Sequence, residues 1–430
     1  MDENQKNIMK DIAIIILAAG KSTRMKSSLP KVLHPVCCRP IFSYVMDLAK
    51  GLRTNKIVTV LGYQAKQVKG LIGPGIKVAL QKNLLGTADA VKQALVLLKN
   101  FKGTVLILYG DTPLLKKETI KKLLDYHIKN RVDATILTAN ADKPEGYGRI
   151  LRDKYSSINA IVEEKDADDF QKAIKEINTG ILCFNKDKLS RAINSIKLNQ
   201  RKKEYYLTDI IGIFYKNGYL VDSVAVTDIN EALGINTRPD LAKANKIMQQ
   251  RINEKLMLEG VSIVDPATCF ISYGTKIGRE SVIYPFTVIE RDVKIGKYCS
   301  IGPFVHLREG TIIEADTVVG NFVEIVRSKI STRVLIKHFS YLGDARIGRE
   351  VNIGAGTVTA NFDGGKKNIT VIEDKAFIGS DTILVAPVKV GKAAKTGAGA
   401  VLTKHKNVPA GATVVGIPAR PLKKITGRTK

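Results

Sequence analysis

The sequence predicts an α/β domain with a mostly parallel sheet, followed by a parallel β-helix. Two observations predict it: residues 1–225 alternate short apolar runs with helical segments, and beyond Gly260 aliphatic residues recur at every sixth position. The length of 430 residues, with 44% hydrophobic and 25% charged residues, suits two or three globular domains and excludes a wholly disordered chain. The longest apolar run, residues 12–19, is far shorter than the ~20 residues that a membrane-spanning helix needs.

In the first half, apolar runs rich in β-branched residues predict buried strands, and helical spacing between them predicts helices. The predicted strands are residues 12–17, 56–61, 77–80, 105–108 and 134–138, and the predicted helices include 41–51, 88–98 and 118–130. Ligands of such sheets bind beyond the carboxyl ends of the strands. The loops after Leu17 and Leu108 are therefore the first places to look for a site.

A different pattern separates the two halves. Residues 238–258 carry apolar side chains at helical spacing without any strand pattern, and Gly260 ends the run. We expect a linker helix within residues 237–260, between a first domain of residues 1–236 and a second domain of residues 261–430.

The second half has a period of six. From Ile271 to Ile325, ten consecutive positions at this spacing are aliphatic, and after short insertions the pattern resumes as far as Val414, interrupted at Thr396. A hexapeptide period is typical of a parallel β-helix, in which three flat faces form each coil and the repeated aliphatic side chain points inward. No coil buries its apolar face alone, so we expect the coils to stabilise one another as an array.

The loop after the first predicted strand reads Leu-Ala-Ala-Gly-Lys-Ser-Thr-Arg-Met over residues 17–25, and Pro30-Lys31 follows it. Small residues at 18–20 allow backbone N–H groups to approach a base or phosphates closely. Arg24 and Lys31 bring two cations to the same place, as phosphoryl transfer requires. The alternative is an ordinary glycine turn with solvated basic side chains.

Tyr109-Gly110-Asp111 ends another predicted strand at the same edge of the sheet. A carboxylate that faces a nucleoside triphosphate there is a suitable Mg²⁺ ligand, because hard cations take oxygen ligands. The alternative is that Asp111 only caps the helix expected after Pro113.

Polar residues interrupt the hexapeptide repeat between residues 321 and 364, among them His338, Tyr341 and several asparagines. The repeat itself needs only aliphatic and small residues, so the cluster suggests a second site. His338 could act there as a general base toward an amine. The alternative is a satisfied surface histidine.

The motif L-A-A-G-x-x-T-R-M-x(4)-P-K resembles the signature of sugar-1-phosphate nucleotidyltransferases. With the hexapeptide repeats after it, the chain resembles the GlmU family over nearly its whole length, from about residue 12 to about residue 408. The resemblance implies a Rossmann-like nucleotidyltransferase domain and a left-handed β-helix acetyltransferase domain. It also implies a cytoplasmic homotrimer that acts in the synthesis of bacterial cell-wall precursors.

The resemblance implies two activities that together make UDP-N-acetylglucosamine. The β-helix domain would transfer an acetyl group from acetyl-CoA to glucosamine 1-phosphate. The first domain would then transfer a uridylyl group from UTP to N-acetylglucosamine 1-phosphate, with Mg²⁺. All of these partners are small anions, which implies neither a nucleic acid nor a membrane as a partner.

The resemblance also assigns residues of the first domain. Lys31 and Arg24 would neutralise phosphate charge in catalysis, and Asp111 and Asn236 would bind Mg²⁺. Tyr-Tyr-Leu-Thr-Asp at 205–209 resembles a further family segment. The residues implied to bind UTP or the UDP-sugar are Leu17, Ala18, Ala19, Gly20, Lys31, Gln81, Gly86, Thr87, Tyr109, Gly110, Asp111, Gly148, Glu163, Asn178 and Asn236.

In the second domain, the resemblance implies that His338 removes a proton from the amine of glucosamine 1-phosphate. Arg308, Tyr341 and Asn352 match the contacts of the sugar phosphate. Ala355, Asn361, Phe362, Ser380 and Ala398 match the contacts of acetyl-CoA.

Three departures from the family pattern concern this second domain. Val326 stands where the family has a substrate-binding Lys, Phe362 stands where a Tyr is usual, and the tail at 415–420 resembles that of β-helix acyltransferases in general. Arg327 could supply the missing cation, although neighbouring residues of a strand point to opposite sides. Val326 favours an alternative in which only nucleotidyl transfer remains and the β-helix is a trimerisation scaffold.

The net charge of +27 admits a nucleic-acid binder as another alternative, but no block of five or more consecutive basic residues occurs. A zinc β-helix hydratase would need several His ligands close together, and the five His are dispersed along the sequence. Five cysteines without a C-x-x-C pair favour a reduced, cytosolic protein over a disulfide framework.

Overall fold

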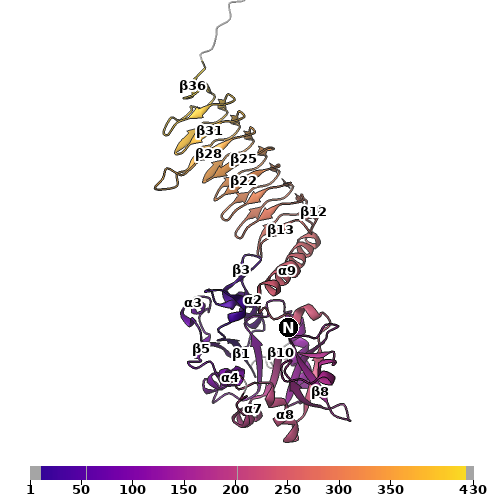
Figure 1. The fold of residues 1–430 in the computed structure, drawn as a ribbon. Coiled ribbons are helices and arrows are strands. Elements are labelled where there is room, and N and C mark those ends of the chain that lie inside the picture. Colours follow the sequence, from indigo (N-terminus) through magenta and orange to yellow (C-terminus); the bar gives the residue numbers. More distant parts are fainter. Residues whose placement is uncertain (1–10, 55, 201, 423–430) are drawn as a thin grey trace, which may run out of the picture. The chain divides into compact units, whose positions relative to one another are not determined.

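The computed structural model describes residues 11–54, 56–200 and 202–422, and the chain forms two compact units, residues 1–245 and 246–430 (Figure 1). The division falls inside helix α9 (Arg238–Leu258), so part of this helix belongs to each unit.

The first unit is built on one mixed sheet with the strand order β11-β7-β10-β6-β1-β4-β5. β1 pairs in parallel with β4 and β6, whereas β10 runs antiparallel between β6 and β7 and also pairs with the β8–β9 hairpin. The strands are β1 (Ile12–Ala18), β4 (Lys56–Leu61), β5 (Lys77–Leu80), β6 (Thr104–Tyr109), β7 (Ala134–Asn140), β8 (Gly148–Arg152), β9 (Ile158–Val162), β10 (Glu176–Asn185) and β11 (Val221–Ala225), with a separate ladder of β2 (Pro35–Val36) and β3 (Arg39–Pro40).

Helices cover both faces of this sheet. They are α2 (Ile41–Gly51), α3 (Ala65–Lys69), α4 (Thr87–Val96), α5 (Lys117–Lys129), α6 (Asp169–Lys172), α7 (Lys186–Ala192) and α8 (Asp209–Lys216), with short 3₁₀ turns η1 (Thr23–Met25), η2 (Lys31–Leu33), η3 (Ile193–Ser195) and η4 (Ile229–Ala232). β1 shows why its sequence is a continuous apolar run: Ile12, Ile14 and Ile16 enter one core, and Ala13, Ile15 and Leu17 enter the other. The strands and helices predicted in this half are confirmed.

Strands β8 to β11 were not predicted from the sequence. The middle of β10 contains Asn178, Thr179 and Gly180, and its pairing with β7 shifts register between Asn178 and Leu182. Only residues 181–184 of β10 form an apolar run, and the polar residues before them interrupt the pattern by which the other strands were predicted.

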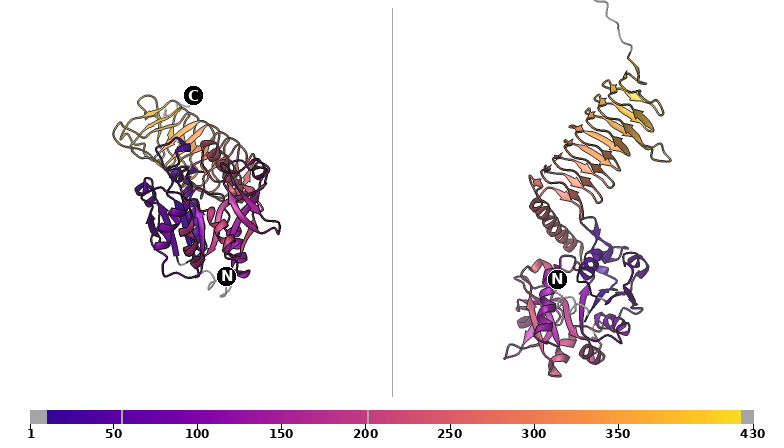
Figure 2. Two further views of the ribbon diagram at one scale, coloured as in Figure 1. Left: turned by 60° about the horizontal axis from the view of Figure 1, so that its bottom comes forward. Right: turned by 180° about the vertical axis from the view of Figure 1, so that it is seen from behind.

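The second unit is a parallel β-helix whose three faces are three ladders of short strands (Figures 1 and 2). One face holds β12 (Ser262–Ile263), β15 (Val282–Ile283), β18 (Ser300–Ile301), β21 (Val318–Val319), β24 (Leu335–Ile336), β27 (Asn352–Ile353), β30 (Phe377–Ile378), β33 (Lys395–Thr396), β35 (Thr413–Val415) and β36 (Arg420–Pro421). A second face holds β13 (Phe270–Ile271), β16 (Val288–Ile289), β19 (His306–Leu307), β22 (Val323–Val326), β25 (Ser340–Gly343), β28 (Val358–Ala360), β31 (Ile383–Val385) and β34 (Val401–Leu402). The third holds β14 (Lys276–Ile277), β17 (Lys294–Ile295), β20 (Ile312–Ile313), β23 (Lys329–Ile330), β26 (Ala345–Ile347), β29 (Thr370–Ile372) and β32 (Val388–Val390).

The residues that recur at every sixth position are those whose side chains point into the coil. All ten aliphatic residues from Ile271 to Ile325 are buried in one continuous core. Thr396, which breaks the period, is buried too, and its hydroxyl pairs with that of Thr382 at 2.9 Å and accepts a hydrogen bond from the Gly379 N–H. The break is therefore a satisfied polar residue inside the coil.

Helix α9 closes the first coil of the β-helix. Buried Asn253 donates hydrogen bonds from Nδ2 to the carbonyls of Pro266 (2.8 Å) and Cys269 (3.1 Å), and Gln249 exchanges hydrogen bonds with the backbone of Ile271. These amides satisfy backbone groups that have no preceding coil to pair with. Within the part of the chain that the structure describes, no helix is both long and apolar enough to cross a membrane.

Candidate functional site

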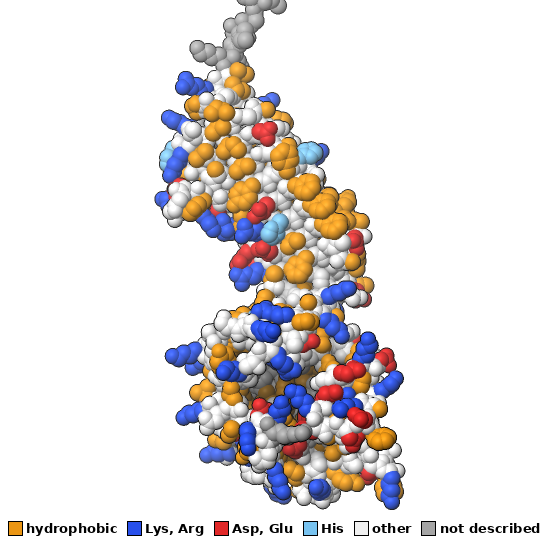
Figure 3. Space-filling view, viewed as in Figure 1, with side chains coloured by type: hydrophobic (Ala, Val, Ile, Leu, Met, Phe, Trp, Pro, Cys, Tyr) orange, Lys and Arg blue, Asp and Glu red, His pale blue; other side chains and the backbone are white. Residues whose placement is uncertain are grey.

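A cavity of about 520 Å³ opens at the carboxyl ends of β1, β4 and β6. The three loops are joined there: Gly110 donates its N–H to the carbonyl of Leu17 (2.9 Å), and Tyr63 donates its N–H to that of Ala19 (3.1 Å). The lining includes Leu17, Ala18, Ala19, Gly20, Arg24, Lys31, Gln81, Gly86, Thr87, Tyr109, Asp111 and Asn236, all of which the sequence analysis singled out. Lys and Arg side chains gather with acidic ones on this unit's surface (Figure 3).

The ammonium of Lys31 bridges two oxygen groups at the floor of this cavity. Its Nζ is bonded to Oδ2 of Asp111 and donates to Oδ1 of Asn236 at 2.9 Å. Arg24 donates to the same Asn236 oxygen at 3.0 Å. The structure therefore brings together both expected cations and both expected metal ligands.

Asn236 is 125 residues from Asp111 in the sequence and is held beside it by its backbone. The N–H of Ile235 donates to the carbonyl of Asp111 at 3.0 Å, and the N–H groups of Asn236 and Thr237 donate to the Asp240 carboxylate. Asp111 does not cap a helix, since α5 begins at Lys117, so the capping alternative is wrong. Carboxylate and amide oxygens suit a hard cation, and two of them suit Mg²⁺, which keeps several waters or phosphate oxygens.

The loop before α4 forms another wall. Gly86 has a φ of 98°, and a Cβ there would lie 2.6 Å from the carbonyl oxygen of Tyr205, so only glycine fits. Thr87 accepts a hydrogen bond from the N–H of Leu207 at 2.9 Å, which ties this wall to segment 205–209. Gln81 is buried and donates to the Gly86 carbonyl (2.9 Å) and to Asp89 (2.8 Å), so its amide nitrogen is used in holding the loop.

The expected sugar contacts, Gly148, Glu163 and Asn178, are not among the residues that line this cavity. Gly148 pairs with Asn178 across β8 and β10, and a Cβ at Gly180 would lie 3.1 Å from the Tyr109 ring. Glu163 accepts a hydrogen bond from the Thr208 hydroxyl at 2.9 Å. Burial raises the pKa of Glu163, and that hydrogen bond opposes the rise.

The cavity also has lining residues that the sequence analysis missed, including Lys21, Tyr63 and Glu204. Lys21 Nζ lies 6.0 Å from the centre of the Tyr63 ring. Tyr63 follows β4, which ends at the same sheet edge as β1, and this position was the signal that could have identified it.

The second cluster lies on the face of the β-helix that contains β19, β22 and β25. His306, Glu324 and Tyr341 are paired in register across three successive strands. Arg308 donates to Glu324 at 2.9 Å, so its guanidinium is already bonded to a carboxylate.

His338 lies two residues before β25 begins, at one corner of the coil, and is exposed. Backbone hydrogen bonds from Gly356 to Phe339, from Asp381 to Ala355 and from Gly399 to Ser380 connect the corresponding corners of the following coils. Ala355, Ser380 and Ala398 therefore continue along the corner at which His338 stands. The structure places one expected base and three expected acetyl-CoA contacts in one row.

Two other expected residues lie apart from this row. Asn352 belongs to β27, on the neighbouring face, and pairs in register with Leu335 and Phe377. Phe362 is exposed on a loop that Asp363 closes, by accepting hydrogen bonds from the N–H groups of Gly365 and Lys366 and from Asn368. One chain alone does not bring Asn352 beside Tyr341.

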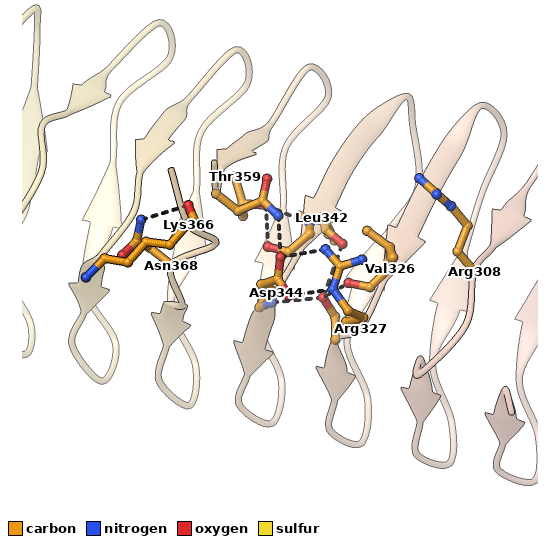
Figure 4. A network of polar contacts seen from close by, with 12 residues as sticks. Arg308, Val326, Arg327, Leu342, Asp344, Thr359, Lys366 and Asn368 are labelled. Atoms are coloured by element: carbon orange, nitrogen blue, oxygen red, sulfur yellow. Dashed lines mark hydrogen bonds and ion pairs between the residues drawn. The ribbon is translucent and has the colours of Figure 1, made fainter. Parts of the chain in front are cut away.

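The position that departs from the family pattern is buried. Val326 is 2% exposed, and Arg327 donates two hydrogen bonds to Asp344 (Figure 4). Arg327 is thus engaged by a carboxylate one coil further along and does not stand in for a free cation at position 326.

Comparison with known families agrees with this division of the chain. Residues 14–177 match the family described as MobA-like NTP transferase domain. Residues 274–309 and 292–327 match the bacterial transferase hexapeptide, and residues 369–404 match the hexapeptide repeat of succinyl-transferase. The repeat matches identify the coil as a left-handed parallel β-helix.

Relatives that cover nearly the whole chain include three proteins that are each named "Bifunctional protein GlmU". The protein from Thermosipho africanus is 45% identical over 423 residues, which are 91% of this chain and 92% of the relative. That from Geobacillus sp. (strain WCH70) is 44% identical over 422 residues, with 90% and 92% covered. That from Geobacillus thermodenitrificans is 41% identical over 435 residues, with 94% of both chains covered.

Proposed function

The chain belongs to the GlmU family of bifunctional proteins, and from this premise we propose how its two units divide the synthesis of UDP-N-acetylglucosamine. The β-helix unit transfers an acetyl group from acetyl-CoA to glucosamine 1-phosphate. The α/β unit then transfers a uridylyl group from UTP to N-acetylglucosamine 1-phosphate. The observation that carries the second assignment is Lys31, which bridges Asp111 and Asn236 in a cavity large enough for a nucleotide.

In the α/β unit, a phosphate oxygen of the sugar phosphate forms a bond to the α-phosphorus of UTP. The bond from that phosphorus to the bridging oxygen breaks, and its electron pair leaves with pyrophosphate. No protein nucleophile is needed. Lys31 and Arg24 hold the phosphate oxygens and neutralise the charge that spreads over them, while the Leu17–Gly20 turn accommodates the base.

We assign Mg²⁺ to Asp111 and Asn236, because their oxygens converge on one ammonium and match the donors that this ion prefers. When bound, Mg²⁺ neutralises triphosphate charge and orients the leaving group. Before the ion can bind, the Lys31 ammonium must leave the oxygens of Asp111 and Asn236 and turn toward the triphosphate. As the nucleotide enters, the two oxygens thus pass from the ammonium to the ion, and the ammonium passes to the phosphates.

Binding of Mn²⁺ as a probe tests this exchange without turnover. We expect Lys31→Gln to bind Mn²⁺ roughly tenfold more tightly than the unsubstituted protein in the absence of nucleotide, because a competing cation is removed. Electron paramagnetic resonance of free Mn²⁺ measures the affinity, with Lys26→Gln as the control. Equal affinities would contradict the assignment of the ion to these two oxygens.

In the β-helix unit, His338 takes a proton from the amine of glucosamine 1-phosphate. The nitrogen then attacks the thioester carbonyl, an N–C bond forms, and the C–S bond breaks with its electron pair passing to the sulfur of CoA, which takes up a proton. The row of Ala355, Ser380 and Ala398 beyond His338 supports this assignment, because small side chains along a corner leave room for an extended ligand.

A product assay tests both steps at once. Purified protein is given glucosamine 1-phosphate, acetyl-CoA, UTP and Mg²⁺, and UDP-N-acetylglucosamine and free thiol are followed. Both should accumulate. If N-acetylglucosamine 1-phosphate is converted but no thiol appears above a His338→Ala control, the β-helix is only a scaffold, which is the alternative that buried Val326 favours.

We also propose that the β-helix assembles as a homotrimer. Phe286, Phe304 and Phe322 stack along one corner with ring centres 4.9 and 5.1 Å apart, yet each stays about half exposed. Apolar side chains gather along this unit in Figure 3, and such a ladder is suited to burial against another copy. Light scattering should give the mass of a trimer, and Phe304→Ser should weaken assembly. Phe170→Ser, which changes an even more exposed phenylalanine of the α/β unit, should not.

We place both reactions in the cytoplasm. No disulfide joins the five cysteines, all of which lie in the described residues, and three of them are buried within strand or coil cores, which suits a reducing compartment.

A further inference from the structure

A row of polar side chains crosses three successive coils at one corner of the β-helix (Figure 4). Arg327 donates from Nε to Oδ1 of Asp344 at 2.8 Å and from Nη2 to Oδ2 at 2.7 Å. Oδ2 of Asp344 also accepts a hydrogen bond from Nδ2 of Asn361. Each residue is 17 positions after the previous one, so the row rises one coil at a time.

The Arg327–Asp344 pair has little freedom. Both residues have left-handed backbone conformations at the corner, with φ of 47° and 49°, and this fixes the direction in which their side chains leave the coil. The hydrogen bonds from Arg327 lower the pKa of Asp344, so this side chain is an ionised carboxylate. Bidentate pairing of this kind is geometrically specific.

The Arg327–Asp344 pair fixes the orientation of the Asn361 side-chain amide. An ionised carboxylate only accepts hydrogen bonds, so Asn361 must present its NH₂ group to Asp344. Its oxygen therefore points away from the carboxylate. The side chain is 6% exposed, and the backbone carbonyl of Asn361 accepts the N–H of Asn368 at 2.7 Å, so the residue is held at both ends.

Asn361 lies beside Tyr341. A Cβ added to Gly343 would lie 2.6 Å from both the Asn361 Nδ2 and the Tyr341 hydroxyl, so the amide and the phenol meet over a position that only glycine leaves open. Tyr341 is assigned to the sugar phosphate and Asn361 to acetyl-CoA. The row therefore ends where the two substrates of acetyl transfer would come together.

We propose that Arg327 and Asp344 are positioning residues for acetyl transfer, which orient Asn361 so that its amide oxygen accepts a hydrogen bond from an N–H group of a bound substrate. The inference rests on the proposed acetyltransferase function. Two kinds of N–H group have the required chemistry: the amide N–H groups in the pantetheine arm of acetyl-CoA, and the amine of glucosamine 1-phosphate. Arg327 acts through Asp344 and Asn361, and contacts neither the phosphates of CoA nor the phosphate of the sugar.

A matched pair in the same β-helix separates positioning from stability. Arg333 and Glu350 are also 17 residues apart, also have left-handed corners with φ of 57° and 58°, and also form an ion pair. Neither is among the residues assigned to a substrate. Arg333→Gln therefore removes a comparable coil-to-coil contact without touching the row that ends at Asn361.

Steady-state kinetics of thiol release from the full-length protein test the proposal. We expect Arg327→Gln to lower kcat/KM for acetyl transfer by roughly tenfold, about the worth of one charge-assisted hydrogen bond, and Arg333→Gln to lower it by less than about twofold. Uridylyl transfer should stay unchanged in both. Arg327→Lys, which keeps one donor to Asp344, should recover most of the loss. A raised KM for acetyl-CoA identifies the pantetheine amides, and a raised KM for glucosamine 1-phosphate identifies the amine.

A double-mutant cycle provides the decisive readout. In an Asn361→Ala background, Arg327→Gln should cost nothing further, because its effect passes through the missing amide. An undiminished loss in that background, or an equal loss from Arg333→Gln, would overturn the proposal. If the unsubstituted protein releases no thiol, the proposed acetyltransferase function fails. Calorimetry of acetyl-CoA and glucosamine 1-phosphate binding then tests the role of Arg327, Asp344 and Asn361 separately. Unchanged affinities for both ligands in Arg327→Gln would overturn the positioning role as well.

Discussion

The α/β unit and the β-helix hold their polar side chains in opposite ways. In the α/β unit, Lys31 reaches partners 80 and 205 residues away in the sequence, because loops from different strands converge on one cavity. In the β-helix, polar partners such as Arg308 and Glu324, or Arg327 and Asp344, lie 16 or 17 residues apart, because each touches only the next coil.

This difference shows where function can be placed on each architecture. A sheet edge concentrates side chains, so one chain builds an enclosed site with its charges already paired. A coil distributes side chains along faces and corners, so its candidate site is an open surface. The first site should therefore be sensitive to single charges, and the second to the alignment of successive coils.

The largest effect that we expect comes from removing the oxygen ligand in the cavity. Asp111→Ala should lower uridylyl transfer by at least about a thousandfold, since it removes the proposed metal ligand and the partner of Lys31. Acetyl transfer should stay within about twofold, because its residues lie in the other unit. Separate assays of pyrophosphate and thiol release measure the two, with Asp142→Ala as a surface control. Equal loss of both activities would sink the idea of two separate sites.

The second effect is its counterpart in the β-helix. His338→Ala should lower acetyl transfer by about a hundredfold or more, which is typical for loss of a general base, and leave uridylyl transfer intact. The same thiol assay measures it, with His405→Ala, another exposed histidine of the coil, as the control. If the two substitutions behaved alike, the base would have to be sought elsewhere.

The third effect tests the alignment of coils. A Cβ at Gly296 would lie 2.6 Å from the backbone nitrogen of Ala315, so Gly296→Ala should destabilise the β-helix by about 1–3 kcal/mol through overpacking. In Gly365→Ala the nearest atom would be 3.8 Å away, so little change is expected there. Denaturant unfolding compares the two variants. Uridylyl transfer by folded Gly296→Ala should be normal, and a loss of that activity would mean that the units depend on each other.

The smallest effect concerns Glu163, a partly buried carboxylate of the α/β unit. Because burial raises the pKa of Glu163 in the folded state, its ionised form destabilises the fold above the ordinary pKa of Glu, and this cost disappears as the pH falls below that value. Glu163→Gln should therefore raise Tm at pH 7 by about a degree or two, and the difference should vanish near pH 4.

The neighbouring residue gives the opposite expectation for the same experiment. Glu164 pairs at 2.8 Å with Arg149, which is buried, so Glu164→Gln leaves a buried cation without its carboxylate and should lower Tm at pH 7. Thermal scans of both variants across pH compare them. A fall in Tm for Glu163→Gln at pH 7 would contradict the role of burial.

Prediction from sequence succeeded where a local pattern carries the information. The strands before Ala18 and Gly110 are apolar runs that end at a turn of small residues, and the inward row of the coil repeats every six residues. It failed at β10, whose first half is polar so that only residues 181–184 form an apolar run, and at Tyr63, which no motif marks.

The sequence by itself determined which residues point into the coil and which loops meet at the sheet edge. The first follows from the six-residue repeat, and the second from the alternation of apolar strands with helices, and both patterns are local. Only the tertiary structure decided which outward residues meet. Deletions and insertions change the length of a coil to between 17 and 25 residues, so the corner at which Arg327, Asp344 and Asn361 align depends on how the coils stack. In the same way, Lys31 contacts both Asp111 and Asn236 because the folded chain brings these distant segments to the same edge of the sheet.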